Sequence, residues 1–184
     1  MYLYHFGEKM NKRKERNRIV RTAITDAVFE LMKQKQLDDI TVTEIIQKAQ
    51  VARISFYRNY ESKEAVLAGL VEDALEDFKA TADYDLSDCY SVRHISRSLE
   101  YFIKYKDYVL NLHNSGYSGM MLTLLNQFHE ITAGSMALKS AERYKLYIFI
   151  GALYNTAIVW IREGSPEPIN VVAEIIADSL RGVK

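Results

Sequence analysis

Residues 41–63 read TVTEIIQKAQVARISFYRNYESK, and this stretch predicts two short helices joined by a tight turn. Thr41 and Glu44 have the spacing of a capping box, in which the threonine hydroxyl accepts the amide of Glu44 and the glutamate side chain reaches back to the cap. The apolar residues that follow predict a first short helix. A turn is expected around Gln50, and a second short helix over residues 53–60.

Helices this short depend on packing, because an isolated helix of fewer than ~12 residues is marginal in water. The apolar residues available for that packing are Val42, Ile45, Ile46, Val51 and Phe56. Upstream, apolar residues at helical spacing predict a longer helix over residues 19–31, preceded by a basic, polar arm over residues 11–18. Downstream, Ser62 is placed as the cap of a long helix that reaches Phe78. Two short helices packed on a longer one are typical of the helix-turn-helix.

The rest of the chain also predicts helices. The 184 residues include only two prolines and eight glycines, and few helix breakers favour long helices. Ser91 or Val92 opens the fifth helix, and Gly164 is placed to stop the eighth. The remaining helices are expected over residues 107–113, 119–134, 141–162 and 169–180. We therefore expect an all-α protein of about nine helices, with a three-helix head and a helical body.

Charge divides the chain in the same way. The net charge is zero, but residues 1–63 hold 13 Lys/Arg against 8 Asp/Glu, whereas residues 64–184 hold 11 against 16. A basic small part beside an acidic large part indicates that the first part meets a polyanion. The alternative is a chance division of charge. On this division we expect a DNA-binding domain over residues 1–63 and a dimerisation and ligand-binding domain over residues 64–184.

The stretch 41–63 closely resembles the DNA-binding signature of the TetR family. The shared features are a capped helix, a turn, a short helix with an aromatic pair, and an aromatic residue followed by Ser-Lys before a long helix. The resemblance implies a dimer that binds operator DNA with an inverted repeat, and a body that binds a small effector. It also implies that Tyr57 contacts phosphate and that Phe56 and Tyr60 lie in the core of the head.

A short helix docked by its apolar side can present its other side to the major groove, which is wide enough for one helix. The residues expected at base edges are Arg53, Ile54, Ser55 and Arg58, with Asn59 beside them. Arginine pairs with guanine through two points, serine reads a donor or an acceptor, and isoleucine contacts a thymine methyl. Thr43 and Lys63 are expected to contact the phosphate backbone, which positions the protein without reading sequence. The alternative for each residue is an ordinary solvated side chain.

Three positions differ from the usual TetR pattern. Gln50 stands where glycine is common, and a left-handed backbone there costs a residue with a Cβ ~1 kcal/mol. Ala52 replaces the usual hydroxyl cap, which also costs ~1 kcal/mol. Asn59 stands where an aromatic residue or histidine is frequent. These differences leave open a protein in which the head binds DNA weakly or not at all.

No residue pattern indicates an enzyme, and no cofactor or metal is expected. The four histidines lack the spacing of a di-metal bundle, and the single cysteine, Cys89, has no cysteine partner for zinc or for an internal disulfide. The sequence contains no phosphate-binding loop or nucleotide fingerprint. A reducing cytoplasm is the expected compartment. We expect no membrane span, because no apolar run is long enough.

Two sets of residues are candidates for binding in the body. Aromatic and methionine side chains predict either an ordinary core or a cavity for a small apolar or aromatic effector. The candidate ligand-binding residues are Tyr101, Tyr105, His113, Tyr117, Met121, His129, Tyr147 and Asn155. Apolar spacing on the last two helices predicts a dimer interface, the alternative being faces buried within one subunit. The candidate interface residues are Leu153, Ala157, Trp160, Ile161, Val172, Ile175, Ile176 and Leu180.

The sequence therefore predicts a sequence-specific DNA-binding transcriptional regulator. The expected mode is repression, with release from the operator when the effector binds. The alternative from another class is a TetR-like coactivator or adaptor that works by protein–protein contact.

Overall fold

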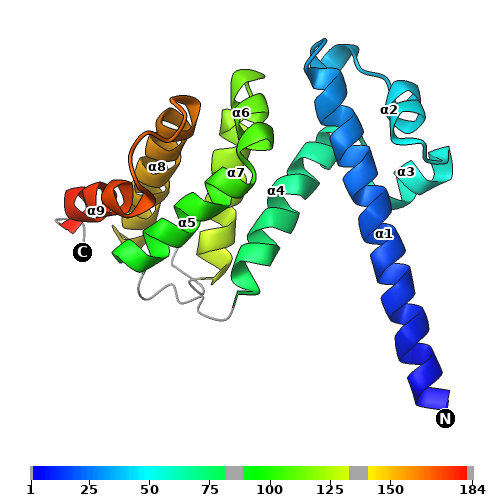
Figure 1. Cartoon of the computed structure of the whole chain (residues 1–184), viewed down its shortest axis with the longest axis horizontal. Helices are drawn as coiled ribbons and strands as arrows, with labels where there is room; N and C mark the ends of the chain where they lie inside the picture. The colour runs from blue at the N-terminus through cyan, green and yellow to red at the C-terminus, as the bar shows by residue number, and fades with distance from the viewer. Residues whose placement is uncertain (1, 82–88, 133–140, 182–184) are drawn as a thin grey trace. The chain divides into compact units, whose positions relative to one another are not determined.

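The computed structural model describes residues 2–81, 89–132 and 141–181, with side chains from Glu15 onward. In this part of the chain there are nine α-helices, one short 3-10 helix and no strand, so the all-α prediction is confirmed (Figure 1). The internal contacts divide the chain into two compact units, Met1–Leu70 and Val71–Lys184. The predicted domain boundary, between residues 63 and 64, falls where the helix shared by both units begins.

The first unit, which we call the head, begins with the long helix α1 (Tyr2–Met32). The turn η1 (Leu37–Asp39) leads into the two short helices α2 (Val42–Ala49) and α3 (Arg53–Asn59). Both short helices pack against the second half of α1 (Figure 1). The head ends with the first turns of α4 (Lys63–Lys79), and the hydroxyl of Ser62 accepts the amide of Ala65 as predicted for a cap, at 3.2 Å.

Helix α1 is much longer than expected. The polar residues 11–18, predicted to form an arm, continue the helix without a break. Lysine, arginine and glutamate have high helix propensity, and no proline interrupts them, so this segment favours a helical backbone. The exposed ion pair between Arg18 and Glu15, one turn apart at 2.7 Å, supports this segment only weakly.

The core of the head consists of apolar side chains from each of its helices. Phe56 of α3 and Ile45 of α2 are completely buried, and Tyr60 at the end of α3 is almost so. The predicted core positions of Phe56 and Tyr60 are therefore confirmed. The residues that surround them are Ile24, Val28, Leu37, Ile40, Val66 and Leu67. Packing of this kind is what maintains helices of seven and eight residues.

The second unit, which we call the body, contains the end of α4 and five further helices. These are α5 (Val92–Lys104), α6 (Lys106–Asn114), α7 (Ser118–Thr132), α8 (Ala141–Arg162) and α9 (Ile169–Ser179). Helix α5 packs against α8 and α9, and α7 lies along α8 (Figure 1). Ser91 caps α5, as expected. Gly164 has a φ of 87° just after α8, which agrees with its predicted role as a helix stop.

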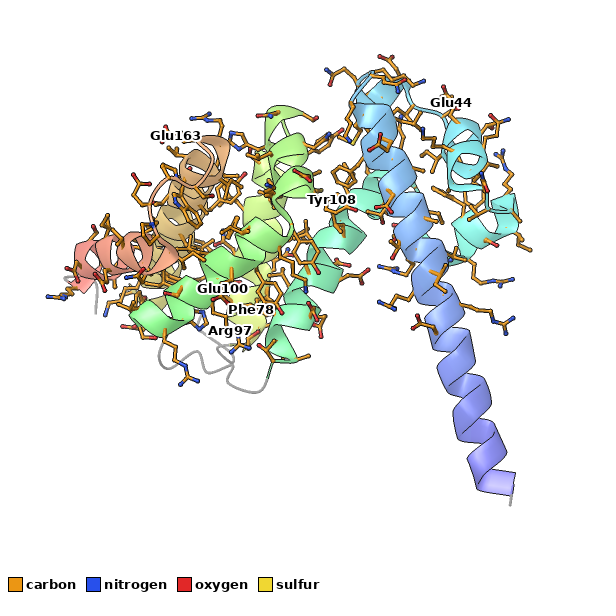
Figure 2. All side chains as sticks on the ribbon, in the orientation of Figure 1. Glu44, Phe78, Arg97, Glu100, Tyr108 and Glu163 are labelled. Carbon is orange, nitrogen blue, oxygen red and sulfur yellow. The ribbon has the colours of Figure 1, made fainter. Side chains whose placement is uncertain are left out.

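The end of α4 is bound to α5 by aromatic contacts. Phe78 is buried, and its ring makes edge-on contacts with Tyr101 and His94 at centroid distances of 5.0 and 5.6 Å. The guanidinium of Arg97 lies 5.9 Å from the centre of the same ring (Figure 2). Asp77, the neighbour of Phe78, adds an ion pair with Lys104 at 2.6 Å.

The residues predicted for the dimer interface need correction. Seven of them, Leu153, Ala157, Trp160, Ile161, Val172, Ile176 and Leu180, are buried inside one subunit. Only Ile175 is exposed. Both helices have apolar residues on several faces, and a face that packs against α5 is no longer available to a partner. For these seven residues the alternative holds, because their side chains belong to the core of the subunit itself.

Helix α8 is also long and apolar enough to cross a bilayer, judged by length and composition alone. The prediction that no such run exists is therefore corrected. Half of the apolar window is buried within the structure, and the core helix of a water-soluble protein has the same properties. The burial of Phe149, Leu153 and Ala157 agrees with a core helix.

Candidate nucleic-acid interface

Helix α3 has one buried and one exposed face, which is the arrangement a recognition helix needs. Phe56 faces the core, whereas Ile54 and Tyr57 are 68% and 49% exposed although both are apolar or amphipathic. Arg53 and Arg58 are exposed on the same short helix. An exposed isoleucine in this position is suited to contact with a thymine methyl.

Two of these side chains are already paired on the surface. The guanidinium of Arg53 donates to the hydroxyl of Tyr57 at 3.4 Å, and it lies 5.5 Å from the centre of the tyrosine ring. The residues are one helical turn apart, which brings them onto the same face. The ring of Tyr57 in turn packs edge-on against Phe56 at 5.3 Å. The buried phenylalanine therefore orients the tyrosine, and the tyrosine orients the arginine.

The turn before α3 contains a left-handed residue, and this conformation is unfavourable for a residue with a Cβ. Gln50 has φ 54° and ψ 41°, which is the left-handed conformation, so the strain expected of a residue with a Cβ is present. Ala52 is the N-cap of α3 and provides no side-chain hydrogen bond. At the other end of α3, the side-chain amide of Asn59 donates to the carbonyl of Ser55 at 2.8 Å. Asn59 and Ser55 are both only partly exposed, so the four exposed residues of α3 are better placed for DNA.

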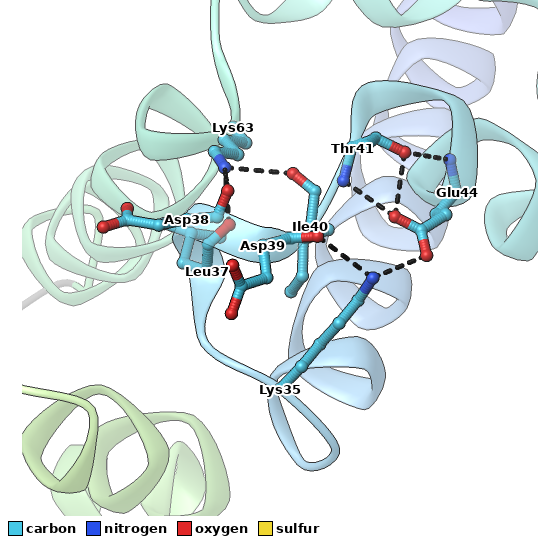
Figure 3. A network of polar contacts seen from close by, with 8 residues as sticks. All are labelled: Lys35, Leu37, Asp38, Asp39, Ile40, Thr41, Glu44 and Lys63. Carbon is cyan, nitrogen blue, oxygen red and sulfur yellow. Dashed lines mark hydrogen bonds and ion pairs between the residues drawn. The ribbon is translucent and has the colours of Figure 1, made fainter.

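Lys63 has hydrogen-bond partners within the head. Its ammonium group donates to the carbonyl oxygens of Leu37, Asp38 and Ile40 at 2.5, 2.8 and 3.0 Å (Figure 3). An ammonium has three N–H donors, and here each has a carbonyl acceptor. A phosphate contact would require at least one of these hydrogen bonds to break. The other predicted backbone contact, Thr43, is exposed on α2.

A second lysine network lies beside the first. The capping box is confirmed, because Thr41 and Glu44 exchange both expected hydrogen bonds, at 3.2 and 2.9 Å. The ammonium of Lys35 donates to the Glu44 carboxylate at 2.5 Å and to the carbonyl of Asp39 at 3.1 Å (Figure 3). The hydrogen bond from Lys35, followed by those from Thr41, lowers the pKa of Glu44 to about 2. Sequence patterns cannot identify the Lys35 contact, because it joins residues nine positions apart across a turn.

The candidate ligand-binding residues of the body belong to several separate contact groups. Tyr101 donates to Asp77 at 3.3 Å, and Tyr105 lies against it at a ring distance of 6.3 Å. His113 contacts the hydroxyls of Tyr154 and Ser118 at 3.2 and 3.0 Å. These groups contain residues from α4 to α8, so they join the helices of the body.

The remaining candidates vary widely in exposure. Met121 is buried, Tyr117 is partly exposed, and Asn155 lies on the exposed side of α8. Tyr147 donates to Glu130, which also pairs with Arg143 at 2.5 Å. Among the described residues, the eight candidates do not form one connected contact group. Among those residues, no cluster of three or more His, Cys, Asp or Glu side chains is placed to hold a metal ion.

His129 has the most unusual environment in this set. It is buried between Phe128 and Phe149, at ring distances of 5.3 and 6.1 Å. Its Nδ1 lies 2.8 Å from the carbonyl of Leu125, and a carbonyl can only accept, so Nδ1 carries the proton. Burial lowers the pKa of His129 to about 4. Its Nε2 is therefore a buried acceptor, for which the described residues supply no donor.

Comparison with known proteins finds a family match for the head. Residues 24–70 match the family described as bacterial regulatory proteins, tetR family. An uncharacterized HTH-type transcriptional regulator of Bacillus subtilis strain 168 is 26% identical over 162 residues, which are 80% of this chain and 42% of that protein. The chain thus spans less than half the length of this relative.

Solved structures agree on the fold. A TetR transcriptional regulator from Streptococcus agalactiae 2603V superimposes with a TM-score of 0.64 at 20% identity, covering 93% of this chain and 98% of that one. The transcriptional regulator FadR from Bacillus subtilis, in complex with stearoyl-CoA, gives 0.52 at 16% identity, covering 89% and 98%. The matched segment contains α2, the left-handed turn, α3 and the start of α4, which are the elements that build the exposed face described above. Residues 24–70 therefore match the tetR family of bacterial regulatory proteins, and the fold agrees with solved structures of TetR regulators.

Proposed function

We propose that the chain is a sequence-specific DNA-binding transcriptional regulator that reads its operator with α3. The observation that carries this proposal is the exposed face of α3, on which Arg53, Ile54, Tyr57 and Arg58 project from a helix anchored by Phe56. The major groove of B-DNA, about 12 Å wide, accommodates one such helix. Arg53 and Arg58 supply two-point donors for guanine, and Tyr57 supplies a hydroxyl for phosphate.

The protein acts as a homodimer in this proposal, with α8 and α9 at the interface. The support is a set of apolar side chains on these helices that the subunit leaves exposed. Ile148 and Val159 of α8 are 51% and 43% exposed, and Ile175 of α9 is 56% exposed. Tyr144 and Val171 extend the same apolar surface, since they lie one turn from Ile148 and Ile175. A two-fold dimer requires an inverted repeat whose half-sites lie about 34–36 Å apart.

In this proposal the body binds a small effector, and effector binding releases the protein from the operator. The protein then acts as a repressor, and it is located in the cytoplasm. FadR, a structural neighbour, holds stearoyl-CoA, and its fold covers most of this chain. The aromatic groups around His129 and His113 supply apolar walls and polar ends of the kind that ligand sites use. The alternative, an adaptor that no longer binds DNA, draws on the strained Gln50 and the uncapped Ala52.

Selection of random duplexes by the purified protein tests the proposal. We expect an enriched inverted repeat, with an affinity for the selected site about 10³-fold or more above that for random DNA. The quadruple variant of Arg53, Ile54, Tyr57 and Arg58 to alanine should fold and lose the enrichment, because these side chains are exposed. Equal binding of all sequences, or no binding, would favour the adaptor.

A further inference from the structure

Lys63 and the three carbonyls that it binds lie on opposite sides of the helix-turn-helix in the sequence. The carbonyls that it binds belong to residues 37–40, which precede α2, whereas Lys63 itself follows α3. The segment between them is the helix-turn-helix. The ammonium therefore joins the two ends of that segment, where the chain enters α2 and where it leaves α3 (Figure 3).

We propose that Lys63 is a positioning residue that closes the base of the helix-turn-helix and makes no phosphate contact. This inference deepens the proposed DNA binding and rests on it. Three converging acceptors use all three N–H donors of the ammonium, so no donor remains for a phosphate. A cation that already has three carbonyl partners would lose hydrogen bonds on moving to DNA, whereas Arg58 is exposed and would lose few.

Lys35 completes the closure from the other side. It binds the carbonyl of Asp39, so two ammonium groups together hold all four carbonyls from Leu37 to Ile40. Lys35 also binds Glu44, whose carboxylate caps α2. The entrance of α2 is thus bound to the turn that follows α1 through Lys35, and to the first residue of α4 through Lys63 (Figure 3). Neither lysine needs DNA for these contacts.

Closure of this kind affects base reading more than general attraction to DNA. Hydrogen bonds to base edges require α3 to be placed accurately, whereas attraction to the phosphates depends on charge and tolerates a loose head. Loss of the closure should therefore reduce the preference for the operator over random DNA. Loss of a phosphate contact should instead weaken both by the same factor and reduce the salt slope by about 0.9.

The test compares Lys63→Met, which keeps the stem and removes the ammonium, with Lys63→Arg, which keeps the charge. The planar guanidinium cannot direct three donors at three converging carbonyls, so it restores a phosphate contact but not the closure. We expect both variants to lower the ratio of operator to random affinity about tenfold, the value of one two-point base contact. The salt slope on random DNA should stay unchanged. Recovery by Lys63→Arg, with a slope lowered by about one in Lys63→Met, would overturn the proposal.

Two controls separate positioning from general instability and from failure of DNA binding itself. Ile24→Val, in the buried core of the head, should lower the melting temperature without changing the operator-to-random ratio. In the free protein, both Lys63 variants should speed amide exchange at Ile40 and Ile45 relative to Ile24→Val, since closure exists without DNA. Unchanged exchange would overturn the closure even if DNA binds. A wild-type protein that binds no DNA would overturn the proposed function, while exchange would still decide whether Lys63 closes the base.

Discussion

On the proposed DNA-binding face, Arg53 and Tyr57 hold each other in a fixed orientation in the absence of DNA. Each side chain is exposed, yet the guanidinium lies over the ring and donates to the hydroxyl. A rigid arginine loses less conformational freedom on binding than one that moves freely in water. The pair also stands on Phe56, which the core holds in place. The buried Phe56 therefore orients Tyr57, and Tyr57 orients Arg53 on the surface.

At this scale we predict that Arg53→Ala weakens operator binding selectively. A two-point contact with guanine is worth about 1–3 kcal/mol, and random DNA lacks a guanine at a fixed position. Affinities for the operator and for a scrambled duplex, measured at one salt concentration, give the comparison. Arg16→Ala, at an exposed position of α1, is the matched loss of one positive charge. Equal weakening on both duplexes by Arg53→Ala would assign the arginine to phosphate.

We also predict that Glu44 makes the stability of the head depend on pH in the acid range. Its pKa in the folded head is about 2, below the ordinary value of 4.5, because Lys35 and Thr41 stabilise the carboxylate. The folded state therefore holds the ionised form more strongly than the unfolded state does. The stabilisation is fully present above pH 4.5 and is lost as the pH falls towards 2.

Thermal unfolding between pH 6 and pH 2.5 checks this prediction. The wild-type head should lose stability below pH 4.5, whereas Glu44→Gln should be less stable at neutral pH and should lack this component of the acid dependence. Glu64→Gln, on the exposed start of α4, provides the matched control and should keep the wild-type profile. Parallel profiles for the wild type and Glu44→Gln would contradict the role of this carboxylate.

At the scale of the element, the turn between α2 and α3 is formed although its sequence opposes it. Gln50 is left-handed, and Ala52 caps α3 without a side-chain hydrogen bond. The backbone is held by hydrogen bonds from the amides of Gln50 and Val51 to the last turn of α2. Burial of Ile45 and Phe56 on either side of the turn supplies the remaining stabilisation.

We predict that Gln50→Gly combined with Ala52→Ser stabilises the head by about 1–2 kcal/mol and leaves DNA affinity equal or better. Glycine removes the strain of the left-handed backbone, and serine supplies the missing cap. Chemical denaturation and operator titration give the two values. Gln47→Gly, inside α2 where the backbone is helical, should destabilise by about 1 kcal/mol instead. A double variant that loses both stability and affinity would contradict the left-handed turn.

At the scale of the whole molecule, the helices expected at the dimer interface also contribute to the core of the body. Ala157 of α8 and Ile176 of α9 are buried, so a glutamate at either would unfold the subunit before it could split a dimer. The exposed residues Ile148 and Ile175 test the same proposed interface without that cost.

We therefore predict that Ile148→Glu with Ile175→Glu gives folded monomers with weak operator binding. A dimer that engages both half-sites gains roughly 100-fold or more in avidity, and this gain should be lost. Analytical ultracentrifugation, circular dichroism and operator titration report assembly, folding and binding separately. Ile131→Glu, at an exposed apolar position of α7, is the matched control and should remain dimeric. A double variant that stays dimeric would place the interface elsewhere.

Features that depend on near neighbours follow from the amino-acid sequence alone. The capping box at Thr41 and Glu44 and the cap at Ser91 each involve residues three positions apart. Local hydrogen bonds and backbone preferences decide them, and a short motif contains all the atoms required. The helical class follows in the same way, from apolar spacing and scarce breakers.

Features that depend on residues brought together from a distance follow from the packing of the helices. Lys63 binds carbonyls 23–26 positions earlier in the chain, so its partners depend on how α4 packs and not on any motif. On α8, apolar residues occupy several faces, and periodicity cannot choose between Ala157 and Ile148 as the buried one. Packing of α8 against α5, α6, α7 and α9 makes that choice, because a helix face becomes interior only when another element covers it.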